Sequence, residues 1–165
     1  MRRATTTLAV AAVLAFPGAA TASPPDAGRL VPGVSLGGVR LGWTLAQVEA
    51  AWGRAYGRCR SCREETLYFN RYAFRPEGAG VTLRRGRVVA VFTLWGPGSW
   101  STTKKLQIGD SALRLAGTYG ALPRTQCIGY SALELPDRRG QSVVYVVDEK
   151  VWGFALLRRG ESACR

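Results

Sequence analysis

The sequence predicts an α+β fold made of two tandem units, each a helix followed by antiparallel hairpins, with the helices packed on one side of antiparallel sheet. Three observations predict it. The segment 39–53 recurs in pattern at 106–120, both copies carry helix-capping signals, and apolar runs separated by turn residues follow each copy. These features assign residues 36–95 to a first unit and 104–165 to a second.

The first predicted helix begins at the N-cap residue Thr44. Gln47, three residues later, completes a capping box, in which each residue bonds the other's backbone amide. Val48 and Trp52 then fall on one helical face, and Gly53 ends the helix. The segment is therefore expected to bury one apolar side.

The second predicted helix repeats this pattern 67 positions later. Ser111 is its N-cap, and Asp110 places a negative charge at the helix start, where the helix dipole favours it. Leu115 and Tyr119 share the apolar face, and Gly120 ends the helix. A chance similarity of two amphipathic helices is the alternative, which the shared cap, aromatic residue and final glycine disfavour.

Each helix is followed by three predicted strands joined by turns rich in Gly, Pro, Asp and Arg. The linker between the units, 96–103, is rich in turn residues. The predicted strands are 67–74, 81–83 and 88–94 in the first unit, and 131–135, 143–147 and 151–157 in the second.

The N-terminus predicts a secretory signal peptide over residues 1–22. Arg2 and Arg3 precede the apolar run 8–16, and small residues at 20–22 form a cleavage site before Ser23. A membrane anchor is the alternative, but the run is shorter than the ~20 residues that span a bilayer. Cleavage lowers the net charge from +12 to +10 by removing two arginines. Residues 23–35, with three prolines, are expected to form a flexible lead-in.

All four cysteines lie in the exported part, which predicts two disulfides. Three pairings are possible, and we favour Cys59–Cys62 with Cys127–Cys164. A redox-active pair at 59 and 62 is disfavoured because a strand-like run follows it rather than a helix. A zinc site is disfavoured because Cys127 and Cys164 are not a second close pair.

The sequence contains few candidate catalytic residues. The absence of histidine excludes serine–histidine and cysteine–histidine catalysis. The acidic pairs 64–65 and 148–149 are adjacent, so their carboxylates are expected to point apart. No phosphate-binding loop or nucleophile elbow is present in the sequence. We therefore expect no enzyme activity, no metal site and no cofactor.

Aromatic and arginine side chains supply the candidate binding residues. An exposed aromatic stripe is predicted from strand alternation and the linker, and an arginine cluster from a hairpin turn. The alternatives are that the aromatic residues fill the core and that the turn is merely solvated. The candidates are Tyr68, Tyr72, Trp95, Trp100, Arg84, Arg85 and Arg87.

The doubled start at 41–48 and 108–115, followed by hairpins and cysteines in an exported chain, resembles the tandem-repeat fold of beta-lactamase inhibitory protein and the related small bacterial outer-membrane lipoprotein domains. The resemblance implies bacterial secretion and protein binding through a concave, aromatic-rich sheet. Two departures matter. No cysteine for lipid attachment follows the signal sequence, and the turn 84–87 is basic where the inhibitor family uses an acidic hairpin residue. We therefore do not infer from the resemblance that this protein inhibits an enzyme.

The sequence thus predicts a secreted, disulfide-bonded, non-enzymatic protein-binding module of bacteria, with an unknown partner. The alternative is an electrostatic binder of an anionic cell-envelope polymer or lipid, since the exported chain keeps a charge of +10. That charge is nearly all arginine, with 20 Arg against 3 Lys, which suggests a compositional bias. Nucleic acid is not expected outside the cell, and no later segment is apolar enough to span a membrane.

Overall fold

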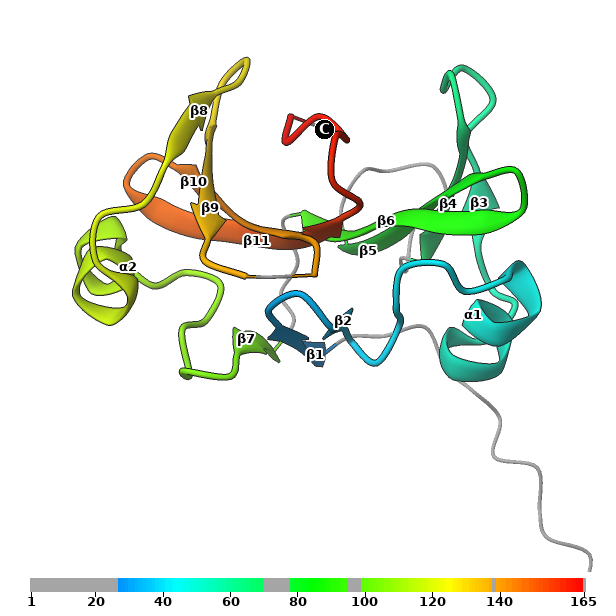
Figure 1. Cartoon of the computed structure of the whole chain (residues 1–165), viewed down its shortest axis with the longest axis horizontal. Helices are drawn as coiled ribbons and strands as arrows, with labels where there is room; N and C mark the ends of the chain where they lie inside the picture. The colour runs from blue at the N-terminus through cyan, green and yellow to red at the C-terminus, as the bar shows by residue number, and fades with distance from the viewer. Residues whose placement is uncertain (1–26, 70–77, 95–98, 138, 165) are drawn as a thin grey trace, which may run out of the picture.

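Strands from both halves of the chain form one continuous antiparallel sheet of eight strands (Figure 1). The computed structural model describes residues 27–69, 78–94, 99–137 and 139–164. Along the sheet the strands are β3 (Gly57–Arg58), β4 (Glu65–Phe69), β5 (Gly78–Arg84), β6 (Arg87–Leu94), β11 (Lys150–Leu157), β10 (Gln141–Val147), β9 (Ser131–Leu135) and β8 (Arg124–Gln126).

A smaller sheet and the helices lie on one side of this large sheet (Figure 1). The small sheet contains β1 (Ala27–Val31), β2 (Ser35–Leu36) and β7 (Ser99–Thr102), with β1 pairing β2 antiparallel and β7 parallel. The helices of the described residues are α1 (Leu45–Trp52) and α2 (Ala112–Tyr119). None of these helices is long and apolar enough to cross a membrane.

The predicted fold class, tandem helix-plus-hairpins units, is wrong. Strands dominate the described chain, and α1 and α2 have only eight residues each. β6 pairs with β11 from Leu94 opposite Gly153 to Ala90 opposite Leu157, so the hairpins belong to one sheet. The physical reason is burial. Both strands are apolar on both faces and almost wholly buried, and such strands are central rather than edge strands.

Two segments predicted as connections are strands in the structure. The predicted flexible lead-in 23–35 contains β1 and the first residue of β2 within its described part, and Leu30 there is fully buried. The predicted linker 96–103 contains β7. The backbones of the two segments hydrogen-bond to each other, because β1 and β7 pair over four residues. This pairing joins positions about seventy residues apart, which local turn signals do not show.

The helix caps form as predicted. The Thr44 hydroxyl accepts a 3.4 Å hydrogen bond from the Gln47 amide, and the Gln47 side chain accepts one of 2.9 Å from the Thr44 amide. Ser111 caps α2 by accepting from the Arg114 amide at 3.1 Å. Gly53 ends α1 at φ 81°, in the left-handed region that favours glycine.

The helix-side face of the large sheet carries the main core. Trp52 of α1 and Trp100 of β7 meet there edge to face, with ring centroids 6.2 Å apart. The Trp52 indole nitrogen donates a 2.8 Å hydrogen bond to the Gly37 carbonyl, so its polar atom is satisfied within the core. Val48 of α1 and Leu115 of α2 belong to the same core and lie on the buried sides of the two helices. The small sheet and the helices are thus anchored by apolar burial.

The opposite face of the large sheet carries a second apolar cluster. Its buried members include Phe92, Tyr145 and Leu157, and Trp152 packs against them. The segment after β11 crosses this face, and its Ala163 is buried there. We call this the outer face, because no helix covers it in Figure 1.

The favoured disulfide pairing is confirmed, since Cys59 bonds Cys62 and Cys127 bonds Cys164. The first bond lies in the loop between β3 and β4. The second joins the loop between β8 and β9 to the segment after β11, across 37 positions of sequence. Both hairpins that stand above the outer face in Figure 1 are therefore covalently held near their tips.

Candidate functional site

The outer face is hollowed by a groove of about 940 Å³, which is the candidate site. Strand alternation explains its position, because Leu67 and Phe69 point into the main core and Tyr68 between them points to the outer face. We call this feature the outer groove. Its lining residues are Cys62, Arg63, Glu64, Thr66, Tyr68, Thr82, Arg84, Phe92, Leu94, Trp152, Glu161, Ser162 and Cys164.

The floor of the outer groove is aromatic because a glycine makes room for it. Tyr68, Gly80 and Phe92 lie opposite one another on β4, β5 and β6. A Cβ on Gly80 would lie 2.4 Å from the Phe92 ring, so only glycine lets this ring lie across β5. Tyr68 then meets Phe92 edge to face at 6.1 Å. The aromatic floor therefore depends on the space that Gly80 leaves on β5.

One edge of the groove is an ion-pair network centred on Arg84. Its guanidinium bonds the Glu64 carboxylate at 2.5 Å and the Glu161 carboxylate at 2.8 Å. The hydrogen bonds that Arg84 donates to Glu64 and then to Glu161 raise the pKa of Arg84 above its ordinary value. Glu161 belongs to the segment after β11, so Arg84 also fastens that segment beside the groove.

Two hairpins stand on either side of the outer face, with the C-terminal segment between them (Figure 1). The β3–β4 hairpin contributes Cys62 and Arg63 to the groove. The tip of the β8–β9 hairpin carries Ile128, whose side chain is 99% exposed, and Cys127 bonds this tip to Cys164. The two disulfides therefore hold in place the β3–β4 hairpin and the segment after β11, both of which line the groove.

The predicted aromatic stripe is not a single surface. Tyr68 lies in the outer groove. Trp100, expected to be exposed, is 1% exposed on the helix side, so that expectation is wrong. Its indole enters the core because Gly28 and Gly37 leave room for it, and a Cβ on Gly28 would lie 2.3 Å from the ring. Tyr72 and Trp95 lie outside the described residues.

The predicted arginine cluster at 84–87 is divided between two surfaces. Arg84 belongs to the outer groove through its ion pairs. Arg85 stands exposed in the turn at φ 52°. Arg87 donates a 3.3 Å hydrogen bond to the Gly42 carbonyl, on the side of α1. Arg84 and Arg87 are paired across the β5–β6 hairpin, so their different hydrogen-bond partners, and not strand alternation, separate the two guanidinium groups.

Sequence reasoning missed Phe92, Leu94 and Trp152, which form most of the floor. It placed them in strands but assigned them no role. The available signal was that 88–94 and 151–157 are apolar at consecutive positions, which indicates apolar residues on both faces of the sheet. One of these faces carries the groove.

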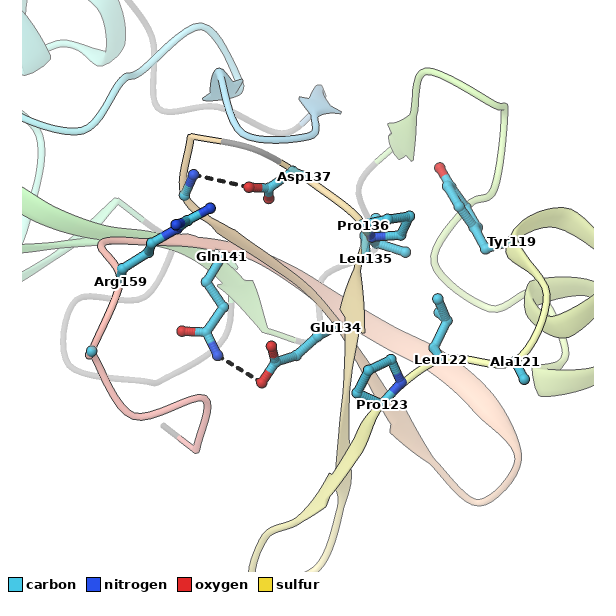
Figure 2. Close-up of a pocket in the computed structure, with 12 residues that line it drawn as sticks. Tyr119, Ala121, Leu122, Pro123, Glu134, Leu135, Pro136, Asp137, Gln141 and Arg159 are labelled. Carbon is cyan, nitrogen blue, oxygen red and sulfur yellow. Dashed lines mark hydrogen bonds between the residues drawn. The ribbon is translucent and has the colours of Figure 1, made fainter.

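A second cavity of about 480 Å³ lies between the end of α2 and the β9–β10 turn (Figure 2). Its polar groups mostly satisfy one another. Gln141 donates to Glu134 at 2.7 Å, and Asp137 accepts from the amides of Gly140 and Ser142 at 2.9 and 2.8 Å. The Tyr119 hydroxyl is buried there without a hydrogen-bond partner in the described structure. The Asp137 hydrogen bonds thus stabilise the β9–β10 turn, and the Gln141–Glu134 bond links β10 to β9.

Both carboxylates of the adjacent pair Glu64–Glu65 form ion pairs with arginines. Glu64 pairs with Arg84, and Glu65 pairs with Arg58 on β3. Within the described ranges, no group of three or more His, Cys, Asp or Glu residues is placed to hold a metal ion. The outer groove therefore offers apolar contact and charged hydrogen-bond donors.

Comparisons with known proteins bear on the fold. No family model and no curated protein matches the chain. The chain is similar in structure to an extracellular protein containing a SCP domain from Bacillus anthracis str. Ames, with a TM-score of 0.52 and 10% identity over 72% of this chain and 44% of that one.

A cysteine-rich secretory protein from Staphylococcus aureus subsp. aureus Mu50 gives a TM-score of 0.45 and 14% identity over the same shares of each chain. The match thus spans less than half the length of both solved chains. The Bacillus likeness, at its low identity, shows the fold alone. The chain shares its overall fold with part of an extracellular bacterial protein.

Proposed function

We propose that the protein is a secreted, non-enzymatic protein-binding module of bacteria that receives its partner in the outer groove. The observation that carries the proposal is the apolar floor of the groove, formed by Tyr68, Phe92, Leu94 and Trp152. Aromatic side chains beside arginine form the centres of protein interfaces more often than other residues do. Arg63 and Arg84 at the edge of this floor supply the arginine.

Export is supported by three independent features. The basic, apolar and small-residue regions of 1–22 match a signal peptide. Both disulfides lie after the predicted cleavage site, and such bonds persist in oxidising compartments. The solved chain with a similar fold is described as extracellular.

Protein binding is favoured over catalysis by how the charged groups are used. The carboxylates beside the groove, Glu64 and Glu161, are both bonded to Arg84. General acid–base catalysis needs a titratable group poised near the working pH and free to transfer a proton. Carboxylates held by a guanidinium instead fix the shape of the site and the segment 158–164.

A capture experiment tests the proposal. Immobilised residues 23–165, with both disulfides formed, are exposed to culture medium and envelope extract of the source bacterium at low and high salt. We expect one protein to be retained at high salt, because apolar contacts are not screened by salt. Loss of all capture at high salt, or no capture at either, contradicts the proposal.

Substitutions in the outer groove test whether the captured protein binds there. Tyr68→Ala, on the groove floor, is expected to lower capture at least tenfold, as is Arg63→Glu at an exposed edge position. Tyr119→Ala, a half-buried tyrosine of the second cavity, is the matched control and is expected to retain capture. Thermal unfolding of each variant confirms that it folds. Capture that survives both groove variants, or that only the Tyr119 variant abolishes, rules out the outer groove.

A further inference from the structure

Exposed arginines from four separate chain segments gather on a surface distinct from the outer groove. The segments are the residues before α1, the β5–β6 turn, the β9–β10 turn and the end of β11. We call this surface the arginine strip. It consists of Arg40, Arg85, Arg87, Arg139 and Arg158, each of which is exposed.

Backbone hydrogen bonds bring the first two segments together. The Gly42 amide donates to the Val88 carbonyl and the Val88 amide donates to the Trp43 carbonyl, both at 2.8 Å. The Arg87 guanidinium reaches the Gly42 carbonyl at 3.3 Å. Arg40, two positions before Gly42, therefore lies beside the start of β6.

The other two segments join the same place. The Arg158 amide donates a 2.8 Å hydrogen bond to the Val89 carbonyl, two positions from Arg87. A Cβ on Gly140, next to Arg139, would lie 3.2 Å from the Leu157 carbonyl and 3.4 Å from the Leu41 side chain. The β9–β10 turn thus lies beside both the end of β11 and the segment before α1, so all four segments lie at the same end of β6, β11 and β10.

The strip keeps its positive charge. None of its five arginines forms an ion pair with a carboxylate of the described chain. The acidic groups nearby are engaged elsewhere, since Asp137 accepts two backbone amides, and Glu64 and Glu161 bond Arg84. At the other end of β10 and β11, the turn carries Asp148 and Glu149. The charge of the strip is therefore not neutralised by a carboxylate of the described chain.

We propose that the arginine strip binds a phosphate-bearing anionic polymer. Guanidinium groups bind phosphate oxygens with paired hydrogen bonds, and Arg is better suited to this than Lys. Neighbouring strands are ~4.8 Å apart, so arginines at the ends of β6, β11 and β10 extend over two strand spacings, which suits a chain with several charges. This interaction is independent of the outer groove.

A lipid surface fits the strip less well than a polymer. Membrane-surface binding adds apolar side chains that enter the headgroup region. Two of the exposed large apolar side chains of the described chain, Leu113 and Ile128, lie on α2 and on the β8–β9 hairpin, away from the strip. The third, Val34, is 37% exposed and lies nearer, since its neighbour Gly33 donates a hydrogen bond to Ser142 of β10. One partly exposed valine is a small apolar anchor beside five arginines, which favours a soluble polyanion.

The test uses long-chain inorganic polyphosphate, with inorganic phosphate and phosphatidylglycerol vesicles as comparison probes, and residues 23–165 with both disulfides formed. Fluorescence anisotropy measures affinity over a range of salt concentrations. We expect polyphosphate to bind and its affinity to fall as salt rises. The variant Arg139→Gln/Arg158→Gln is expected to weaken binding on the order of tenfold and to reduce the salt slope by about two.

The control variant Arg54→Gln/Arg114→Gln removes the same charge from ion-paired arginines outside the strip. It is expected to leave affinity within about twofold of the parent chain, because long-range charge alone contributes little at moderate salt. Equal weakening by both double variants, phosphate binding as tight as polymer, or binding only to vesicles would each overturn the proposal. Tyr68→Ala is expected to leave polyphosphate binding unchanged, so failure here and failure of the groove are separate results.

Discussion

Cys164 is bonded to Cys127, and this bond fastens the segment after β11 to the β8–β9 hairpin across the outer face. Ala163 beside it is 7% exposed against the apolar cluster of that face. The bond therefore shapes one wall of the outer groove and also limits the unfolded chain, because it closes a long loop.

Removing this disulfide with Cys127→Ser/Cys164→Ser is expected to lower the free energy of unfolding by about 4 kcal/mol, as loop-closure entropy gives for a separation of 37 positions. Urea unfolding followed by tryptophan fluorescence measures it. The control is Cys59→Ser/Cys62→Ser, which opens a separation of 3 and is expected to cost about 1.5 kcal/mol. Equal losses in the two variants would contradict the loop-closure explanation.

Gly153 lies at the junction of β6 and β11, opposite Leu94. A Cβ there would lie 2.0 Å from the Thr93 carbonyl oxygen, which is backbone and cannot turn aside. Gly153→Ala is therefore expected to destabilise the chain by about 3 kcal/mol, since overpacking forces the two strands apart. The measurement is the urea midpoint at constant m-value.

Gly117→Ala is the matched control for that substitution. Gly117 lies within α2, and a Cβ there meets nothing within 4 Å. Alanine is the better helix former, so the variant is expected to gain about 0.5–1 kcal/mol. A loss at position 117, or no loss at position 153, would show that backbone space does not decide these two sites.

The features that the sequence predicted correctly depend on residues close together in the chain. The capping box needs only Thr44 and Gln47, and the turn between β5 and β6 needs Arg85 and Gly86. The disulfide from Cys127 to Cys164 is a long-range exception. It could be predicted because four cysteines allow only three pairings.

What the sequence could not predict is set by contacts between distant segments. Trp100 is buried because Gly28, more than seventy positions earlier, leaves space for its ring. The groove floor exists because β6 pairs with β11, which brings Trp152 to the same face as Phe92. A period-two pattern assigns a side chain to one of two faces, but the pairing of strands decides what else lies on that face.

The Thr44 cap is expected to contribute more than the Ser111 cap, because only the Thr44 cap has a reciprocal bond, which the Thr44 amide donates to the Gln47 side chain. Thr44→Ala is expected to cost about 1 kcal/mol, and Ser111→Ala somewhat less. Thermal unfolding measures both. Thr103→Ala, an exposed loop position, controls for loss of a hydroxyl and is expected to change little. A larger loss at Ser111 than at Thr44 would rule out the reciprocal bond as the cause.

Tyr56 donates a 2.7 Å hydrogen bond to the Glu49 carboxylate. This bond, with burial and the Glu49 charge, raises the pKa of Tyr56 above its ordinary value of 10.0, and Arg58 opposes the rise. Since the folded pKa exceeds the unfolded one, the contribution to stability is complete below the unfolded pKa and is lost as pH rises through the folded pKa.

We expect Glu49→Gln to lower the pKa of Tyr56 toward its ordinary value and Arg58→Gln to raise it, because the first removes the negative charge and the second the opposing positive one. Absorbance titration of tyrosinate measures both, with Tyr56→Phe identifying the step that belongs to this residue. Arg54→Gln also removes a cation paired with Glu49, but Arg54 makes no contact with the phenol, so it is the control. A Tyr56 pKa that is unmoved by Glu49→Gln would show that the carboxylate is not its cause.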